Sequence, residues 1–87
     1  MKQTIEIMKT MNNDLLDKFT DVTNRSKGQT NFLFDLCDGD FQKLVKLEEK
    51  IKNNFLSYCP EDKEEVEKIL TMDDESGWYN LDQFKTL

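Results

Sequence analysis

The sequence contains no histidine, and its 87 residues include only one proline and two cysteines. Histidine is the usual general base at neutral pH and the commonest metal ligand, so its absence excludes catalytic triads and imidazole metal sites. Carboxylates remain available for acid and base chemistry, but no two of them share an apolar setting that would push their pKa values apart. We therefore expect this protein not to be an enzyme.

The two cysteines, Cys37 and Cys59, lack the CxxC spacing of redox and metal sites. They lie beside acids or at the end of an apolar helix, conditions that raise the pKa of a thiol. We expect free thiols in a reducing cytoplasm, and a Cys37–Cys59 disulfide is the less favoured alternative. The chain also lacks a signal-peptide pattern and an apolar run long enough to cross a bilayer, so we expect a cytoplasmic protein without membrane contact.

Glycine is scarce, and none of the three glycines belongs to a ligand-binding loop. A calcium-binding loop needs an oxygen ligand five residues before its glycine, whereas Phe34 precedes Gly39 and Met72 precedes Gly77 at that distance. No glycine-rich phosphate loop occurs either. We expect no metal and no cofactor, and we interpret the acids around Gly39 as helix caps.

Acidic residues are abundant, but they are unevenly distributed. The net charge is -6. Residues 1–59 carry nine acidic and nine basic side chains, whereas residues 60–87 carry nine acidic and only three basic ones. We therefore divide the chain, which we expect to fold as a single helical domain of residues 1–87, into a neutral body (1–59) and an acidic C-terminal third (60–87). Such a chain repels nucleic acid and anionic membranes, so we expect no direct nucleic-acid binding.

Apolar side chains recur at helical spacing through most of the chain. The segments that show this spacing are 4–22, 30–36, 41–58 and 60–72, with a further short segment after Gly77. In the longest apolar stretch, Leu44, Leu47 and Ile51 share one helical face, which Phe55 and Tyr58 extend. The sequence predicts an all-α fold, a small three- to four-helix bundle with a short C-terminal helical tail.

Turn and capping residues predict where these helices end. Gly28 is expected to cap the first helix at its C-terminus, and Thr30 or Asn31 to cap the second at its N-terminus. Asp38-Gly39-Asp40 either separates two helices, with Asp40 as the N-cap of the next one, or forms a kink in one long helix. A glycine inside a helix costs about 1 kcal/mol, so the sequence favours the break.

Two candidate binding features lie in the first half of the chain. The adjacent residues Phe32, Leu33 and Phe34 cannot all face one side of a helix, so they are either buried all round or partly offered to a second copy or a partner. Arg25, Lys27 and Thr30 lie where a helix begins and could hold a small anion. An ordinary solvated turn is the favoured interpretation of that second group.

The acidic third combines carboxylates with aromatic side chains. Aromatic residues supply anchors for protein contacts, and surrounding carboxylates steer the chain toward a basic surface. Carboxylates along a helix, which rises ~1.5 Å per residue, also imitate duplex DNA, with one charge per ~1.7 Å. The predicted partner-binding residues are Glu61, Glu64, Glu65, Asp73, Asp74, Glu75, Trp78, Tyr79 and Phe84. Alternatively, these residues have structural roles: the acids cap helices and form ion pairs, and the aromatic residues complete the core.

In size, acidity and richness in Lys, Asn, Ile and Phe, the chain resembles the small proteins that phages and other mobile elements use to block host defence or host transcription. The resemblance is one of composition, so it assigns no site residues. It implies an inhibitor of the DNA-mimic or anti-defence type. Together with the charge layout, it favours a non-enzymatic inhibitor or regulator of a basic, nucleic-acid-handling host protein.

Two other functions remain open at this stage. The first is a self-associating helical module that sequesters a small anion or nucleotide near Arg25, Lys27 and Thr30. The second is a homodimer or higher oligomer that acts as an adaptor through the Phe32-Leu33-Phe34 surface.

Overall fold

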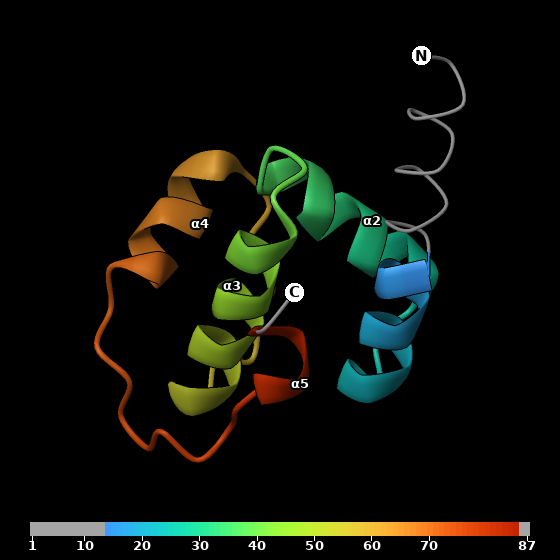
Figure 1. The fold of residues 1–87 in the computed structure, drawn as a ribbon. Coiled ribbons are helices and arrows are strands. Elements are labelled where there is room, and N and C mark those ends of the chain that lie inside the picture. Colours follow the sequence, from blue (N-terminus) through green and yellow to red (C-terminus); the bar gives the residue numbers. More distant parts are fainter. Residues whose placement is uncertain (1–13, 86–87) are drawn as a thin grey trace. The chain divides into compact units, whose positions relative to one another are not determined.

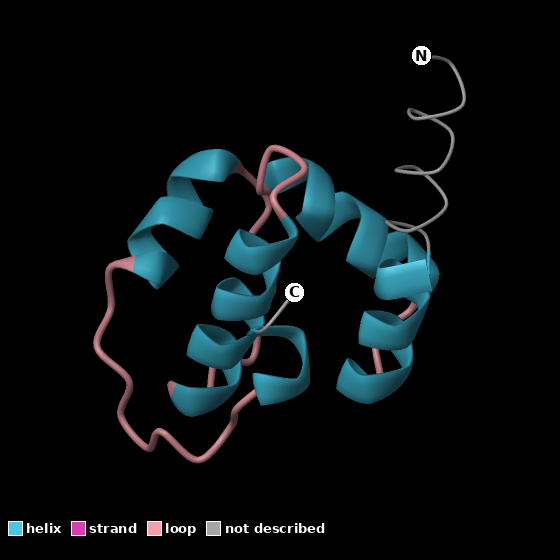
Figure 2. Cartoon of the chain, viewed as in Figure 1, coloured by secondary structure: helices cyan, strands magenta, loops and turns pink. Residues whose placement is uncertain are grey.

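The computed structural model describes residues 14–85, in which every regular element is a helix. Residues 14–23 are helical, and four labelled helices follow: α2 (Lys27–Leu36), α3 (Phe41–Asn53), α4 (Lys63–Leu70) and α5 (Asp82–Lys85) (Figures 1 and 2). The predicted all-α helical fold is therefore confirmed. The first part of the helix predicted over 4–22 lies outside the described residues.

The chain divides into two compact units, and the boundary falls inside α2, between Phe32 and Leu33. We call them the N-terminal unit and the C-terminal unit and describe each by itself. The C-terminal unit contains α3 from the neutral body together with the whole described part of the acidic third. The change in charge at residue 60 therefore lies within one compact unit.

In the N-terminal unit, Asn24 ends the first helical segment, not the predicted Gly28. Asn24 has a left-handed backbone with φ 64°, and the N–H of Arg25 donates to the carbonyl of Thr20 at 3.2 Å. Asparagine tolerates this conformation because its short polar side chain bonds locally. The prediction for Gly28 was wrong, because Gly28 lies inside α2.

Ser26 caps the N-terminus of α2, four residues before the predicted cap at Thr30. The backbone N–H of Gln29 donates to Ser26 Oγ at 3.1 Å, which satisfies one of the free donors of the first turn. Thr30 is buried inside the helix, and its hydroxyl accepts a hydrogen bond from Thr20 Oγ1 at 2.8 Å. The predicted cap at Thr30 or Asn31 was therefore wrong, since Ser26 already supplies one.

The predicted break between α2 and α3 is confirmed, and so is its cap. Asp38 and Gly39 both have left-handed backbones, with φ 58° and 74°, and the N–H of Gly39 donates to the carbonyl of Phe34 at 3.0 Å. This hydrogen bond closes the end of α2. Asp40 then caps α3, because its carboxylate accepts from the backbone N–H of Lys43 at 3.2 Å.

α3 ends at Asn53, five residues before the predicted end at Tyr58. The N–H of Leu56 donates to the carbonyl of Ile51 at 3.0 Å across a left-handed Phe55 with φ 55°. Asn54 supports this ending through its side-chain amide, which donates to the carbonyl of Lys50 at 3.0 Å. Phe55 and Tyr58 were expected on the buried face, but they are 66% and 52% exposed.

α4 runs parallel to α3 in the C-terminal unit. Three ion pairs join the two helices and their flanks in ascending order along both: Asp38 with Lys63, Lys43 with Glu67, and Lys50 with Asp74. The segment between the helices, residues 54–62, therefore returns along the length of α3 before α4 begins (Figure 1). α4 starts at a cap, because the Asp62 carboxylate accepts from the N–H of Glu65 at 2.8 Å.

α5 packs against α3 with the opposite direction. The N–H of Leu81 donates to the Glu49 carboxylate at 2.6 Å, and the carbonyl of Phe84 accepts from Gln42 Nε2 at 2.7 Å. Apolar residues from three helices and their flanks form the buried interior of this unit: Leu44, Val45, Leu47, Ile51, Val66, Ile69, Leu81 and Phe84. Each such side chain contributes about 1.5–3 kcal/mol when fully buried.

None of the helices within residues 14–85 combines the length and the apolar composition that crossing a bilayer would require. The longest, α3, has 13 residues.

Asn53 holds the segment 71–81 against the end of α3. Its side chain is 1% exposed, and both of its amide atoms bond to one residue: Oδ1 accepts from the N–H of Tyr79 at 2.8 Å, and Nδ2 donates to the carbonyl of Tyr79 at 3.2 Å. Nδ2 also donates to the Asp74 carboxylate at 3.2 Å, and Ser76 Oγ donates to Asn53 at 3.3 Å. We call these contacts the Asn53 clamp.

Replacing Asn53 with alanine should destabilise the protein by about 2–4 kcal/mol, because it leaves buried backbone groups without hydrogen-bond partners. The exposed Asn80 provides a matched control, and Asn80→Ala should change the free energy of unfolding by less than about 0.5 kcal/mol. Urea denaturation of both variants measures the difference. Equal effects would show that the clamp does not stabilise the fold.

Candidate functional site

Six carboxylates of the acidic third make no ion pair with any other described residue: Asp62, which caps α4, and the five considered next. Glu61, Glu64, Asp73 and Glu75 are exposed, and Glu65 is half-buried. We call these five residues the acidic surface. Glu64 and Glu65 lie in the first turn of α4, where the positive end of the helix dipole stabilises negative charge. Their place in the fold is thereby explained, yet their charges are not neutralised.

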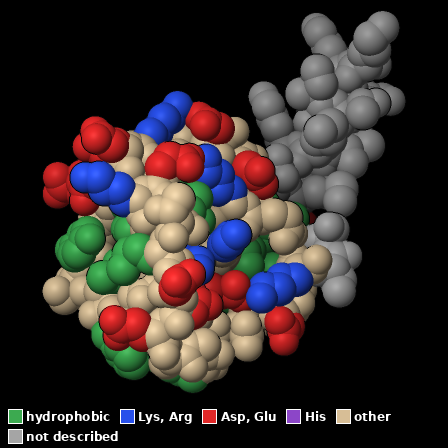
Figure 3. Space-filling view, turned by 90° about the vertical axis from the view of Figure 1, so that its left-hand side faces the viewer, with side chains coloured by type: hydrophobic (Ala, Val, Ile, Leu, Met, Phe, Trp, Pro, Cys, Tyr) green, Lys and Arg blue, Asp and Glu red, His purple; other side chains and the backbone are tan. Residues whose placement is uncertain are grey.

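Two lysines beside α4, Lys43 and Lys63, pair with other acids. Lys43 Nζ lies 2.6 Å from a Glu67 oxygen, and this hydrogen bond raises the pKa of Lys43. The Lys63 ammonium is hydrogen-bonded to Asp38 and lowers the pKa of that carboxyl. Figure 3 looks onto the side of α4 and shows acidic and basic side chains interspersed there, with apolar side chains between them. These pairs do not include the carboxylates of the acidic surface.

Trp78 is the most exposed of the predicted aromatic anchors, at 60%. Its ring lies edge-on to that of Tyr79, with 5.5 Å between centroids, and Tyr79 is half-buried. The Asn53 clamp fixes the backbone of Tyr79, so Trp78 projects from a held segment. A side chain in such a position can enter a partner's pocket with little loss of entropy.

Two of the predicted partner-binding residues have structural roles instead. Phe84 is fully buried and packs edge-to-face on Phe41 at 5.3 Å, so it belongs to the core and cannot serve as a surface anchor. Asp74 lies 3.1 Å from Lys50 Nζ and accepts from Asn53, so its charge is compensated within the fold. Helical spacing alone does not show which aromatic of the tail turns inward.

Sequence reasoning missed Phe55, Tyr58 and Met72 as surface residues, which are 66%, 52% and 37% exposed. The first two follow α3 at helical spacing, which predicted burial for both. The pair Asn53-Asn54 was the available signal, because asparagine side chains compete with helical hydrogen bonds and favour helix ends.

The structure does not bring the Phe32-Leu33-Phe34 cluster to one surface. Leu33 is 1% exposed, Phe34 is half-buried, and only Phe32 is largely accessible, at 47%. Leu33 therefore offers no area to a second copy of the chain. The oligomeric state remains a prediction.

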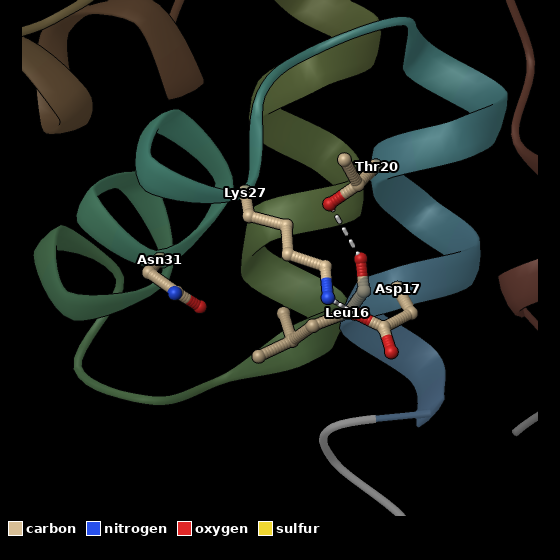
Figure 4. Close-up of a pocket in the computed structure, with 5 residues that line it drawn as sticks. All are labelled: Leu16, Asp17, Thr20, Lys27 and Asn31. Atoms are coloured by element: carbon tan, nitrogen blue, oxygen red, sulfur yellow. Dashed lines mark hydrogen bonds and ion pairs between the residues drawn. The ribbon is translucent and has the colours of Figure 1, made fainter.

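The predicted anion site at Arg25, Lys27 and Thr30 is also dispersed. Lys27 Nζ lies 3.5 Å from the Asp17 carboxylate, and Thr30 is buried with its hydroxyl bonded to Thr20. A cavity of about 260 Å³ lies beside this ion pair and is lined by Leu16, Asp17, Thr20, Lys27 and Asn31 (Figure 4). Neither Arg25 nor Thr30 lines it, and Asp17 would repel an anion there.

Cys37 is fully buried, and burial raises the pKa of its thiol to about 11. A thiol of this kind is a poor nucleophile. The acids near it are engaged by α3 and Lys63: Asp40 as a cap and Asp38 as an ion-pair partner. Within the described part of the chain, no three His, Cys, Asp or Glu side chains gather closely enough to hold a metal ion.

Comparisons with protein-family models, curated proteins and solved structures gave no match for this chain. The function is therefore argued from the chemistry of its own surface.

The raised pKa of Cys37 predicts a loss of stability in alkali. The folded state keeps the thiol proton up to about pH 11, whereas an ordinary thiol loses it near 9.0, so this contribution is present below pH 9.0 and disappears as the pH rises through about 11. The Cys37→Ala variant removes it. Thermal unfolding of both proteins across this range should give curves that converge, and parallel curves would contradict the assignment.

Proposed function

We propose that this protein is a non-enzymatic inhibitor or regulator that binds a basic, nucleic-acid-handling protein of its host through the acidic surface and Trp78. The observation that carries the proposal is the set of unpaired carboxylates in the same unit as an exposed, held tryptophan. Uncompensated carboxylates accelerate encounter with a basic surface, and a tryptophan supplies contact area after encounter.

Nucleic-acid-handling proteins are the favoured partner class because their binding surfaces are basic and bind regularly spaced anions. Glu61 precedes α4, Glu64 and Glu65 lie in its first turn, and Asp73 and Glu75 lie beyond its end. Within α4, the adjacent carboxylates Glu64 and Glu65 are separated by a rise of ~1.5 Å, which is close to the charge spacing of duplex DNA, ~1.7 Å. The protein then occupies the partner's nucleic-acid site and excludes DNA by competition.

The resemblance in composition extends this proposal to the origin of the chain and the place where it acts. We propose that a phage or another mobile element encodes the chain and uses it in the host cytoplasm against defence or transcription. The two other functions have weaker support. The predicted anion site is dispersed over Arg25, Lys27 and Thr30, and the Phe32-Leu33-Phe34 cluster is partly buried.

Neutralising three exposed acids of the surface tests this function. The variant Glu64→Gln, Asp73→Asn, Glu75→Gln should capture basic proteins from a host lysate about tenfold less well than the wild type, because steering charge is lost. A control variant, Asp14→Asn, Asp21→Asn, Asp35→Asn, removes equal charge from exposed positions elsewhere and should capture them normally.

Two further arms use the same captured proteins. High salt should weaken capture by the wild type, because surface charges are screened, and duplex DNA should compete with it. Equal capture by the two charge variants, or capture that resists both salt and DNA, would contradict the proposed function.

A further inference from the structure

Phe55 combines two unfavourable features that the fold of the C-terminal unit does not explain. Its backbone is left-handed, with φ 55°, and its side chain is 66% exposed. The other non-glycine residues of this kind between 14 and 85 are Asn24 and Asp38, whose short polar side chains tolerate the conformation. A glycine or an asparagine at position 55 would close α3 with less strain and less exposed apolar surface.

Strain of this kind persists where the residue serves something other than stability. An aromatic ring kept in water at a strained turn fits a contact residue better than a core residue. The turn itself is closed by backbone hydrogen bonds from Phe55 and Leu56 to α3, at 3.2 and 3.0 Å, which do not depend on the aromatic side chain.

Phe55 lies at the same end of α3 as Trp78. Phe55 follows Asn53 by two residues, and Trp78 precedes Tyr79, whose backbone N–H and carbonyl both bond to the Asn53 side chain. Figure 1 shows the segment 71–81 passing close to the last turn of α3. Two exposed aromatic residues from distant parts of the sequence therefore lie at one end of the unit, and one of them belongs to the segment that the clamp holds.

The charges in the segment that carries Trp78 favour one class of partner. Asp73 and Glu75 belong to the same held segment as Trp78, they are exposed, and neither takes part in an ion pair within residues 14–85. Apolar rings next to unpaired carboxylates complement a segment that carries both aliphatic and cationic side chains, and an arginine can also stack on the indole. A second copy of this chain, with net charge -6, does not provide that charge.

We propose that Phe55 and Trp78 form a two-ring anchor for a segment of the partner in which arginine or lysine alternates with aliphatic residues. The inference rests on the proposed function and specifies which part of a basic partner the surface recognises. Carboxylates attract the cationic side chains, and the two rings cover the aliphatic ones. Phe55 is retained for this contact although the fold is less stable with it.

A pair of synthetic peptides tests the anchor: one alternates arginine with leucine, and the other replaces each leucine with serine. By calorimetry the wild type should bind the leucine peptide about tenfold more tightly than the serine peptide. Phe55→Gly should abolish this preference, bind the serine peptide as the wild type does, and raise the melting temperature by about 2–6 °C, because the strain is relieved.

Phe32→Ala is the matched control, since it removes another exposed phenylalanine, from α2, and should leave the preference intact. If Phe55→Gly keeps the preference for the leucine peptide, or if the wild type binds both peptides equally, the anchor is refuted while the acidic surface stands. If neither peptide binds the wild type, both proposals are refuted. A concentration-dependent dimer of the wild type that Phe55→Gly dissociates would assign Phe55 to self-association and overturn the anchor.

Discussion

The C-terminal unit depends on the two hydrogen bonds between the amide of Asn53 and the backbone of Tyr79. The segment 71–81 has no regular secondary structure, so its backbone groups cannot satisfy one another. The buried side chain of Asn53, at the end of α3, bonds this backbone as a neighbouring peptide group would, because its amide offers a donor and an acceptor with similar spacing. The direction in which the chain approaches α5 is set at this point.

The Asn53 clamp also positions the residues that follow and precede Tyr79. Two residues after Tyr79, the N–H of Leu81 reaches the buried carboxylate of Glu49, and Phe84 then packs on Phe41. In the other direction, Lys50 holds Asp74 and so joins the end of α4 to α3. These lysine pairs have a second consequence: they engage Asp38, Glu67 and Asp74 and leave the acidic surface outside the ion pairs of residues 14–85.

Sequence periodicity predicted the helices whose apolar face and caps are set by residues close together in the sequence. Leu44, Leu47 and Ile51 lie on the buried face of α3, and Asp40 caps it, because a cap and an apolar stripe are written within a few adjacent residues. The end of α3 was not predictable in the same way. Phe55 and Tyr58 continue the stripe, but Phe55 adopts a left-handed backbone, and the Leu56 N–H and the Asn54 amide bond back to α3 and close it. The apolar spacing does not record this turn, and the contacts of Asn53 depend on Tyr79, 26 residues later.

The candidate site likewise contains some residues whose exposure local sequence predicts and others whose exposure depends on tertiary packing. Glu61, Glu64 and Glu75 are exposed, as is usual for acidic residues, although Glu48 and Glu49 of α3 are buried. The positions of Trp78 and Phe84 depend on which way the held segment turns. Both are aromatic residues of the tail, and the sequence around them does not show which one is buried. Only the packing of α5 on α3 places Phe84 inside and leaves Trp78 outside.

The division of aromatic residues between core and surface carries the strongest energetic argument for a partner. Burying a large apolar side chain contributes about 1.5–3 kcal/mol, and a small domain has a net stability of only about 5–15 kcal/mol. A chain of 87 residues that leaves Phe55 and Trp78 exposed by 66% and 60% therefore forgoes a substantial part of its available stability. Since Phe84 shows that this unit can bury an aromatic ring, the exposure of Phe55 and Trp78 supports the proposed contact with a partner.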